Sequence, residues 1–98
     1  MMRVAAALIG LAVVLSLIVY PRLPERVPIH WNAAGHVDGY APRLEAVVVV
    51  PIAMLAVAAI FAVIPRRVTP RTHDVIFCSL LLLLFAVHVW VLFAGVSS

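Results

Sequence analysis

Charged side chains are scarce in this sequence. Only 11% of its 98 residues are charged, while 66% are hydrophobic. Soluble domains are nearer to about a quarter charged and about half apolar. This balance excludes an ordinary soluble domain and is typical of an integral membrane protein.

Lysine is absent and cysteine occurs once. All seven positive side chains are arginines, and they lie at the ends of apolar segments. Contacts with lipid headgroups account for arginines in such places, so the net charge of +3 does not indicate nucleic-acid binding. Cys78 cannot form an internal disulfide and is expected to be a packing residue, because it lies in an apolar run.

Sequence patterns of hydrolases are also missing. There is no H-E-x-x-H pattern, and no serine stands in a nucleophile-elbow context. We therefore expect a protein that is not an enzyme and that uses no cofactor.

Three long runs carry no charge. They span Val4–Tyr20, Ala46–Ile64 and Val75–Val96. A helix needs about 20 apolar residues to cross a hydrocarbon core about 30 Å thick, and backbone groups in lipid must be paired within the segment. The sequence thus predicts an all-α transmembrane fold, a single membrane domain over 1–98. Its expected parts are helices at 4–20, 46–64 and 75–96, a polar loop at 21–45 and a cytoplasmic loop at 65–74.

The first run has a competing interpretation as a cleaved signal peptide. It ends in Val19-Tyr20-Pro21, without the small residues of a cleavage site, so an uncleaved helix is predicted. With the N-terminus inside, the short loop that holds Arg66 and Arg67 is cytoplasmic, as the positive-inside rule favours. The loop at 21–45 is then extracytoplasmic.

Polar and aromatic residues gather in the stretch VPIHWNAAGHVDGY, residues 27–40. The loop is too short to form its own core and must lean on the helix ends. Asn32 at the start of a turn and Gly35 at a left-handed position predict a hairpin, and Gly39 marks a second turn. The expected register pairs Asn32 with His36, Trp31 with Val37 and His30 with Asp38.

That register places four polar side chains on one face of the hairpin. They are the candidate binding residues His30, Asn32, His36 and Asp38. Trp31 and Tyr40 have the amphipathic character of membrane-interface anchors and complete the candidate surface. A loop metal site built on the two histidines and the aspartate is a distant alternative, because the spacing matches no standard zinc pattern. Hydrogen bonding within the loop is the favoured interpretation, so no metal is expected.

His88 is the one strongly titratable side chain deep in an apolar run. Such residues face the interior of a bundle and suggest a functional site. A small-solute or ion-handling subunit that uses His88 is therefore an alternative function. The simpler interpretation is a neutral histidine bonded to Ser16 or to a backbone carbonyl.

The hairpin and its flanking helices resemble a known family. The residues that carry the resemblance are Leu23-Pro24, then Val27-Pro28-Ile29-His30-Trp31-Asn32, and then Gly35, Asp38, Gly39 and Tyr40. Together they are similar to the bacterial membrane family of domain of unknown function 1648. This module is also found at the N-terminus of SdpI-type immunity proteins, which are longer. The resemblance covers about residues 14–64.

The resemblance implies a bacterial cytoplasmic (inner) membrane protein with several spans. It further implies a role in immunity or signalling through interaction with a protein or peptide. The candidate partners, beyond the lipid bilayer itself, are another membrane protein, a second copy of this chain, or a membrane-active peptide. The extracytoplasmic loop would be the recognition surface.

Overall fold

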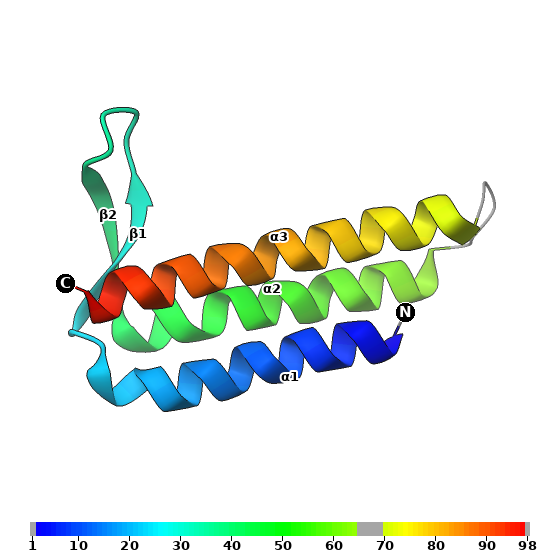
Figure 1. Ribbon diagram of the computed structural model, residues 1–98, viewed down its shortest axis with the longest axis horizontal. Helices are drawn as coiled ribbons and strands as arrows, with labels where there is room; N and C mark the ends of the chain where they lie inside the picture. Colours follow the sequence, from blue (N-terminus) through cyan, green and yellow to red (C-terminus); the bar gives the residue numbers. More distant parts are fainter. Residues whose placement is uncertain (1, 65–69, 98) are drawn as a thin grey trace.

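The computed structural model describes residues 2–64 and 70–97 of the chain. The elements follow the order α1, η1, β1, β2, α2, α3. Their bounds are α1 Met2–Val19, the 3-10 helix η1 Tyr20–Arg22, β1 Arg26–Trp31, β2 Val37–Pro42, α2 Arg43–Val63 and α3 Pro70–Val96. The fold is thus three helices with a β-hairpin between the first two, as Figure 1 shows.

The three α-helices are each long and apolar enough to cross a membrane. Their outward surface is built of exposed large apolar side chains, among them Leu17, Ile52 and Leu83. Only hydrocarbon can surround such side chains on every helix without a large free-energy cost. The predicted all-α transmembrane fold is confirmed, and the chain is a multi-pass membrane protein.

All three helices begin earlier than their apolar runs, and α1 starts at Met2 rather than Val4. Helix α2 starts at Arg43 rather than Ala46, and α3 starts at Pro70 rather than Val75, so the predicted loop at 65–74 is too long at its C-terminal end. Charged and polar residues continue a helix beyond the hydrocarbon, and proline is well suited to the first helical position. Residues 65–69 of that loop lie outside the described part of the chain.

The additional first turn of α3 also caps the C-terminal end of α2. Nε2 of His73 lies 3.2 Å from the Phe61 carbonyl oxygen, one of the last carbonyls of α2. Such carbonyls have no partner inside their own helix, and a side-chain donor can satisfy them. The His73 ring also meets the Phe61 ring edge-on, with 5.3 Å between centroids, and Phe61 stacks on Phe77.

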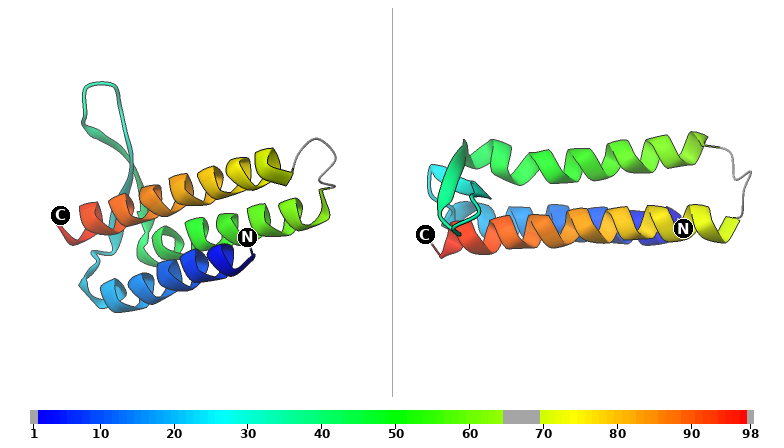
Figure 2. Two further views of the ribbon diagram at one scale, coloured as in Figure 1. Left: turned by 45° about the vertical axis from the view of Figure 1, so that its right-hand side comes forward. Right: turned by 90° about the horizontal axis from the view of Figure 1, so that it is seen from above.

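The helices form a bundle in which each packs on the other two. Seen from above, α2 lies to one side of α1 and α3 (Figure 2, right). The buried side chains fall into two clusters along the bundle. The cluster far from the hairpin contains Ala5, Ala12, Met54, Phe77 and Leu81. The cluster beside the hairpin contains Leu23, Val27, Ala46, Val47, Val91 and Leu92.

The root of the hairpin packs on α3 through Gly95. A Cβ atom at this position would lie 2.6 Å from Leu23 Cδ2 and 3.1 Å from Val27 Cγ1. Val27 is fully buried and Leu23 nearly so. The short polar segment therefore depends on the helix ends for its apolar contacts, as expected from its length.

From this root the hairpin extends across the direction of the helices and past the side of α3 (Figure 1, Figure 2). The helices must run roughly along the membrane normal in order to span the bilayer. The hairpin consequently lies along the membrane surface rather than standing straight out from it. A groove lined by Trp31 of β1 and by Ala86 and Trp90 of α3 follows from this placement.

We predict that Gly95→Ala lowers the free energy of unfolding by about 1–3 kcal/mol, because the new methyl group displaces Leu23 and Val27. Thermal unfolding in detergent, followed by tryptophan fluorescence, measures the change. Gly10→Ala is the matched control: a Cβ there meets no atom within 4 Å, and alanine favours helix. Equal midpoints for the two variants would contradict this packing.

Candidate functional site

The tip of the hairpin is a turn whose backbone is held by hydrogen bonds. The Asn32 side-chain oxygen accepts from the amides of Ala34 and His36, each at 3.0 Å. The amide of Asn32 donates to the His36 carbonyl at 2.9 Å, and the amide of Gly35 donates to the Asn32 carbonyl at 3.0 Å. Gly35 has φ 84°, the left-handed conformation that glycine adopts without strain. The turn predicted from Asn32 and Gly35 is present.

The strand register differs from the prediction at one residue. Trp31 pairs with Val37 as expected, but His30 pairs with Gly39 rather than with Asp38. Irregularities on both sides of His30 leave Asp38 as an additional residue in β2. The second turn predicted at Gly39 is wrong, because Gly39 lies within β2. Glycine permits the pairing with His30, since a Cβ on Gly39 would lie 3.0 Å from the Cβ of His30.

The shifted register still brings the His30 and Asp38 side chains together. His30 Nδ1 lies 2.5 Å from Asp38 Oδ1. The side chains keep 71% and 42% of their surface exposed, so the pair contributes at most about 1 kcal/mol to stability. Its consequence is positional: the imidazole is held with Nδ1 toward the carboxylate, which leaves the Nε2 edge for another group.

The aromatic residues of the hairpin bind it to its surroundings. The Trp31 ring meets the Trp90 ring of α3 edge-on, with 5.9 Å between centroids and 68° between planes. The guanidinium of Arg26 lies 5.7 Å from the centre of the Tyr40 ring. Trp31 is half-buried and Tyr40 is half-exposed. The contact between Trp90 and Trp31 arises because the fold brings the hairpin beside α3.

The predicted surface therefore divides in two. Asn32 serves the turn, whereas His30, His36 and Asp38 are exposed to solvent or headgroups. Among residues 2–64 and 70–97, no group of three His, Cys, Asp or Glu side chains is placed to hold a metal ion. The described part of the hairpin is thus an exposed polar surface on an ordered backbone.

His88 is completely buried in the bundle. Its Nε2 lies 2.7 Å from the hydroxyl of Ser16 on α1. That hydroxyl also donates to the Ala12 carbonyl at 2.8 Å. Since serine has one hydroxyl hydrogen, we infer that Nε2–H of His88 donates to the serine oxygen. Nδ1 of His88, which has no partner among the described residues, then carries a lone pair rather than a buried N–H.

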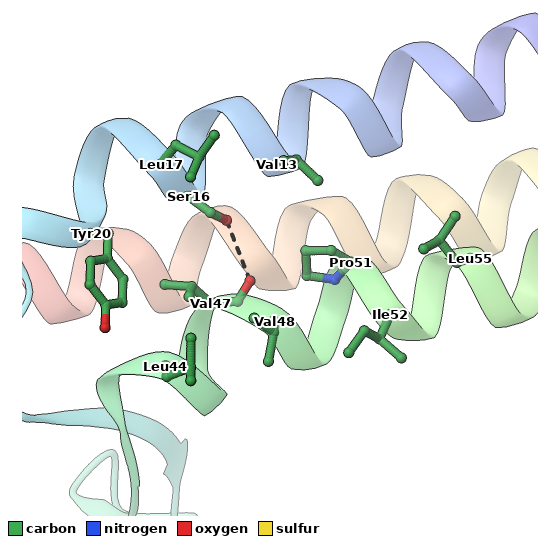
Figure 3. Close-up of a pocket in the computed structure, with 10 residues that line it drawn as sticks. All are labelled: Val13, Ser16, Leu17, Tyr20, Leu44, Val47, Val48, Pro51, Ile52 and Leu55. Atoms are coloured by element: carbon green, nitrogen blue, oxygen red, sulfur yellow. Dashed lines mark hydrogen bonds between the residues drawn. The ribbon is translucent and has the colours of Figure 1, made fainter.

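The third helix joins this contact through a carbonyl. Pro51 has no N–H, so the Val47 carbonyl in α2 lacks its usual donor four residues later. The Ser16 hydroxyl lies 3.5 Å from that carbonyl oxygen, as Figure 3 shows. One serine thereby connects all three helices. The missing donor at Pro51 is visible in the sequence, but the partner that approaches Val47 is not.

The structure therefore defines a class: a three-helix membrane protein with a hairpin at one end of the bundle. The model of a family described as a domain of unknown function (DUF1648) matches residues 7–55, which include most of α1, the hairpin and the N-terminal part of α2. The chain belongs to this family. Comparison with curated proteins and with solved structures gave no significant match.

We predict that Ser16→Ala lowers the free energy of unfolding by about 1–2 kcal/mol, because His88 loses its partner inside the apolar bundle. Ser79→Ala is the matched control, since Ser79 is exposed on α3. Chemical or thermal unfolding in detergent measures both. If Ser16→Ala unfolds at the same midpoint as Ser79→Ala, the contact does not stabilise the bundle.

Proposed function

We propose that this protein is a non-enzymatic membrane protein that binds another protein or a membrane-active peptide through its hairpin. The proposed site is the outer face of the bacterial cytoplasmic membrane, in a role like that of SdpI-type immunity or signalling proteins. The observation that carries the proposal is the exposed polar tip, which projects past the side of the bundle on a firmly packed root (Figure 1).

The rigidity of the hairpin supports a binding role. Its turn is closed by the Asn32 contacts, and its root is buried beside Gly95. A surface that is already ordered loses little conformational entropy when a partner binds. His30 and Asp38 are held in one relative orientation by their hydrogen bond, so they can offer a donor and acceptor pattern that a partner recognises.

The placement of the hairpin favours a partner at the membrane surface. Trp31 and Trp90 have the amphipathic rings that settle at the level of the headgroups. Amphipathic membrane-active peptides lie at that same level, with their apolar side in the acyl region and their polar side outward. A hairpin that lies along the surface can meet such a peptide edge to edge.

His88 supports ion or solute handling less well. Its Nε2 bonds to Ser16, and the ring is enclosed by the helices. None of the runs 4–20, 46–64 and 75–96 contains a carboxylate that could exchange a proton with it. A role in holding the bundle together accounts for the contacts of His88 without a transport function.

The orientation can be tested by cysteine labelling. In a Cys78→Ala background, we expect His36→Cys at the hairpin tip to react with a membrane-impermeant thiol reagent in intact cells. Thr72→Cys, near the opposite end of the bundle, should react only after the membrane is permeabilised. The reverse pattern would place the hairpin in the cytoplasm and overturn this part of the proposal.

The binding role can be tested by protection of cells. A strain that lacks the gene is complemented with variants and challenged with a panel of membrane-active peptides. We expect His30→Ala and Asp38→Ala to reduce survival about tenfold or more, because each removes half of the exposed pair.

Glu25→Ala is the matched control for that experiment. It removes an exposed carboxylate near the hairpin root without touching the pair. Amounts of each variant in the membrane fraction must be equal. Full protection by both hairpin variants would contradict the proposal.

A further inference from the structure

A groove runs between α1 and α2 on a different face from the hairpin surface. Its volume is about 480 Å³, within the range of small-molecule sites. Figure 3 shows its lining side chains, which are Val13, Ser16, Leu17 and Tyr20 from the α1 side and Leu44, Val47, Val48, Pro51, Ile52 and Leu55 from α2. Almost all of this lining is apolar.

The Ser16 hydroxyl, a polar group in the lining of the groove, is already engaged. The Ser16 hydroxyl bonds to Ala12 and His88, and it also approaches the Val47 carbonyl. A polar solute would lose its hydration in the groove and gain few hydrogen bonds in return. A hydrocarbon chain has no hydrogen bonds with water to lose, so the chemistry of the groove favours an alkyl occupant.

The length of the groove matches one leaflet of a bilayer. From Leu44 to Leu55 it follows twelve residues of α2, whose ends are about 16 Å apart along the helix. A hydrocarbon core about 30 Å thick gives each leaflet about half of that depth. The groove begins at the first turn of α2, where the chain passes from the membrane interface into the hydrocarbon core. It has the reach of one acyl chain, extending from the headgroup level to the middle of the bilayer.

A cation marks the interface end of the groove. The Arg43 guanidinium lies 5.4 Å from the centre of the ring of Tyr20, a lining residue. Its Nε donates to the Pro24 carbonyl at 3.4 Å, which holds the side chain in place. Among the described residues, no carboxylate forms an ion pair with Arg43. Guanidinium binds phosphate through two parallel hydrogen bonds and suits a lipid headgroup.

A second apolar groove, between α1 and α3, provides a contrast. It is lined by residues such as Leu15, Val89 and Phe93 and has about 230 Å³, roughly half the volume. No arginine among the described residues stacks on a ring of its lining. Of these two grooves, the one between α1 and α2 combines the length of an acyl chain with a fixed cation at its outer end.

We propose that the α1–α2 groove is a binding site for one anionic phospholipid, with an acyl chain between the helices and its phosphate on Arg43. The lipid fills the space beside Pro51 and covers the seam at which Ser16 joins the helices. This site does not depend on the hairpin's partner, and the two proposals can fail separately.

The test is native mass spectrometry of the full chain in a non-ionic detergent. Phosphatidylglycerol and phosphatidylcholine with the same acyl chains are titrated against the protein. We expect one phosphatidylglycerol to bind about tenfold more tightly than phosphatidylcholine, because only the former has a net negative headgroup for Arg43. Equal binding of the two lipids would overturn the assignment of the headgroup to Arg43.

Two matched pairs of variants locate the lipid. Val13→Phe should fill the groove and reduce binding of phosphatidylglycerol at least fivefold, whereas Val14→Phe adds the same bulk outside the groove and should not. Arg43→Gln should remove the preference for phosphatidylglycerol, while Arg26→Gln, which loses a cation at the same end of the bundle, should retain it.

Arg43→Lys guards against a merely structural effect, because it keeps the positive charge and should preserve the preference for phosphatidylglycerol. Thermal unfolding must show that every variant is folded. Equal effects of the two phenylalanine variants would show that the groove is not the site. A lipid-free dimer that Val13→Phe separates would show that a second copy of the chain covers the groove, which also overturns the proposal.

Discussion

Inside a bilayer, a buried imidazole has no water to bond, so the partner of His88 constrains how the three helices meet. That partner is the Ser16 hydroxyl, which also bonds within α1 and approaches the carbonyl that Pro51 leaves free in α2. Apolar packing against lipid gives little preference for one arrangement of helices over another. A few polar contacts in the bundle can therefore fix the relative positions of helices whose surfaces are otherwise interchangeable.

The packed end of the helix bundle allows the short segment between α1 and α2 to form an ordered hairpin. Leu23 and Val27 gain their burial from α3, at a place where Gly95 leaves room for them. The tip then needs only local hydrogen bonds, which Asn32 provides. The order of dependence runs from the polar contact in the membrane, to the packed hairpin root, to the exposed His30 and Asp38 side chains.

Patterns that act over short distances could be predicted from the sequence. The charge-free runs predicted three membrane helices, and the spacing of Asn32 and Gly35 predicted the turn, because each depends on neighbouring residues. The position of His30 opposite Gly39 could not be predicted, since it arises from irregular pairing on both sides of His30. The extension of α3 to Pro70 was missed because hydrophobicity marks where lipid ends and not where a helix begins.

Contacts between distant segments were predictable only where chemistry left few choices. His88 needs a polar partner in an apolar bundle, and Ser16 was one of the few available, so the favoured interpretation named Ser16 or a backbone carbonyl as that partner. Arg43 can meet many polar partners at the end of the bundle, so its partner could not be predicted in this way. Its place over Tyr20 arises because the hairpin brings the start of α2 back beside the end of α1. The same return that builds the hairpin thus sets a cation beside an apolar groove. The short segment between α1 and α2 therefore shapes two surfaces, the exposed hairpin tip and the apolar groove between these helices.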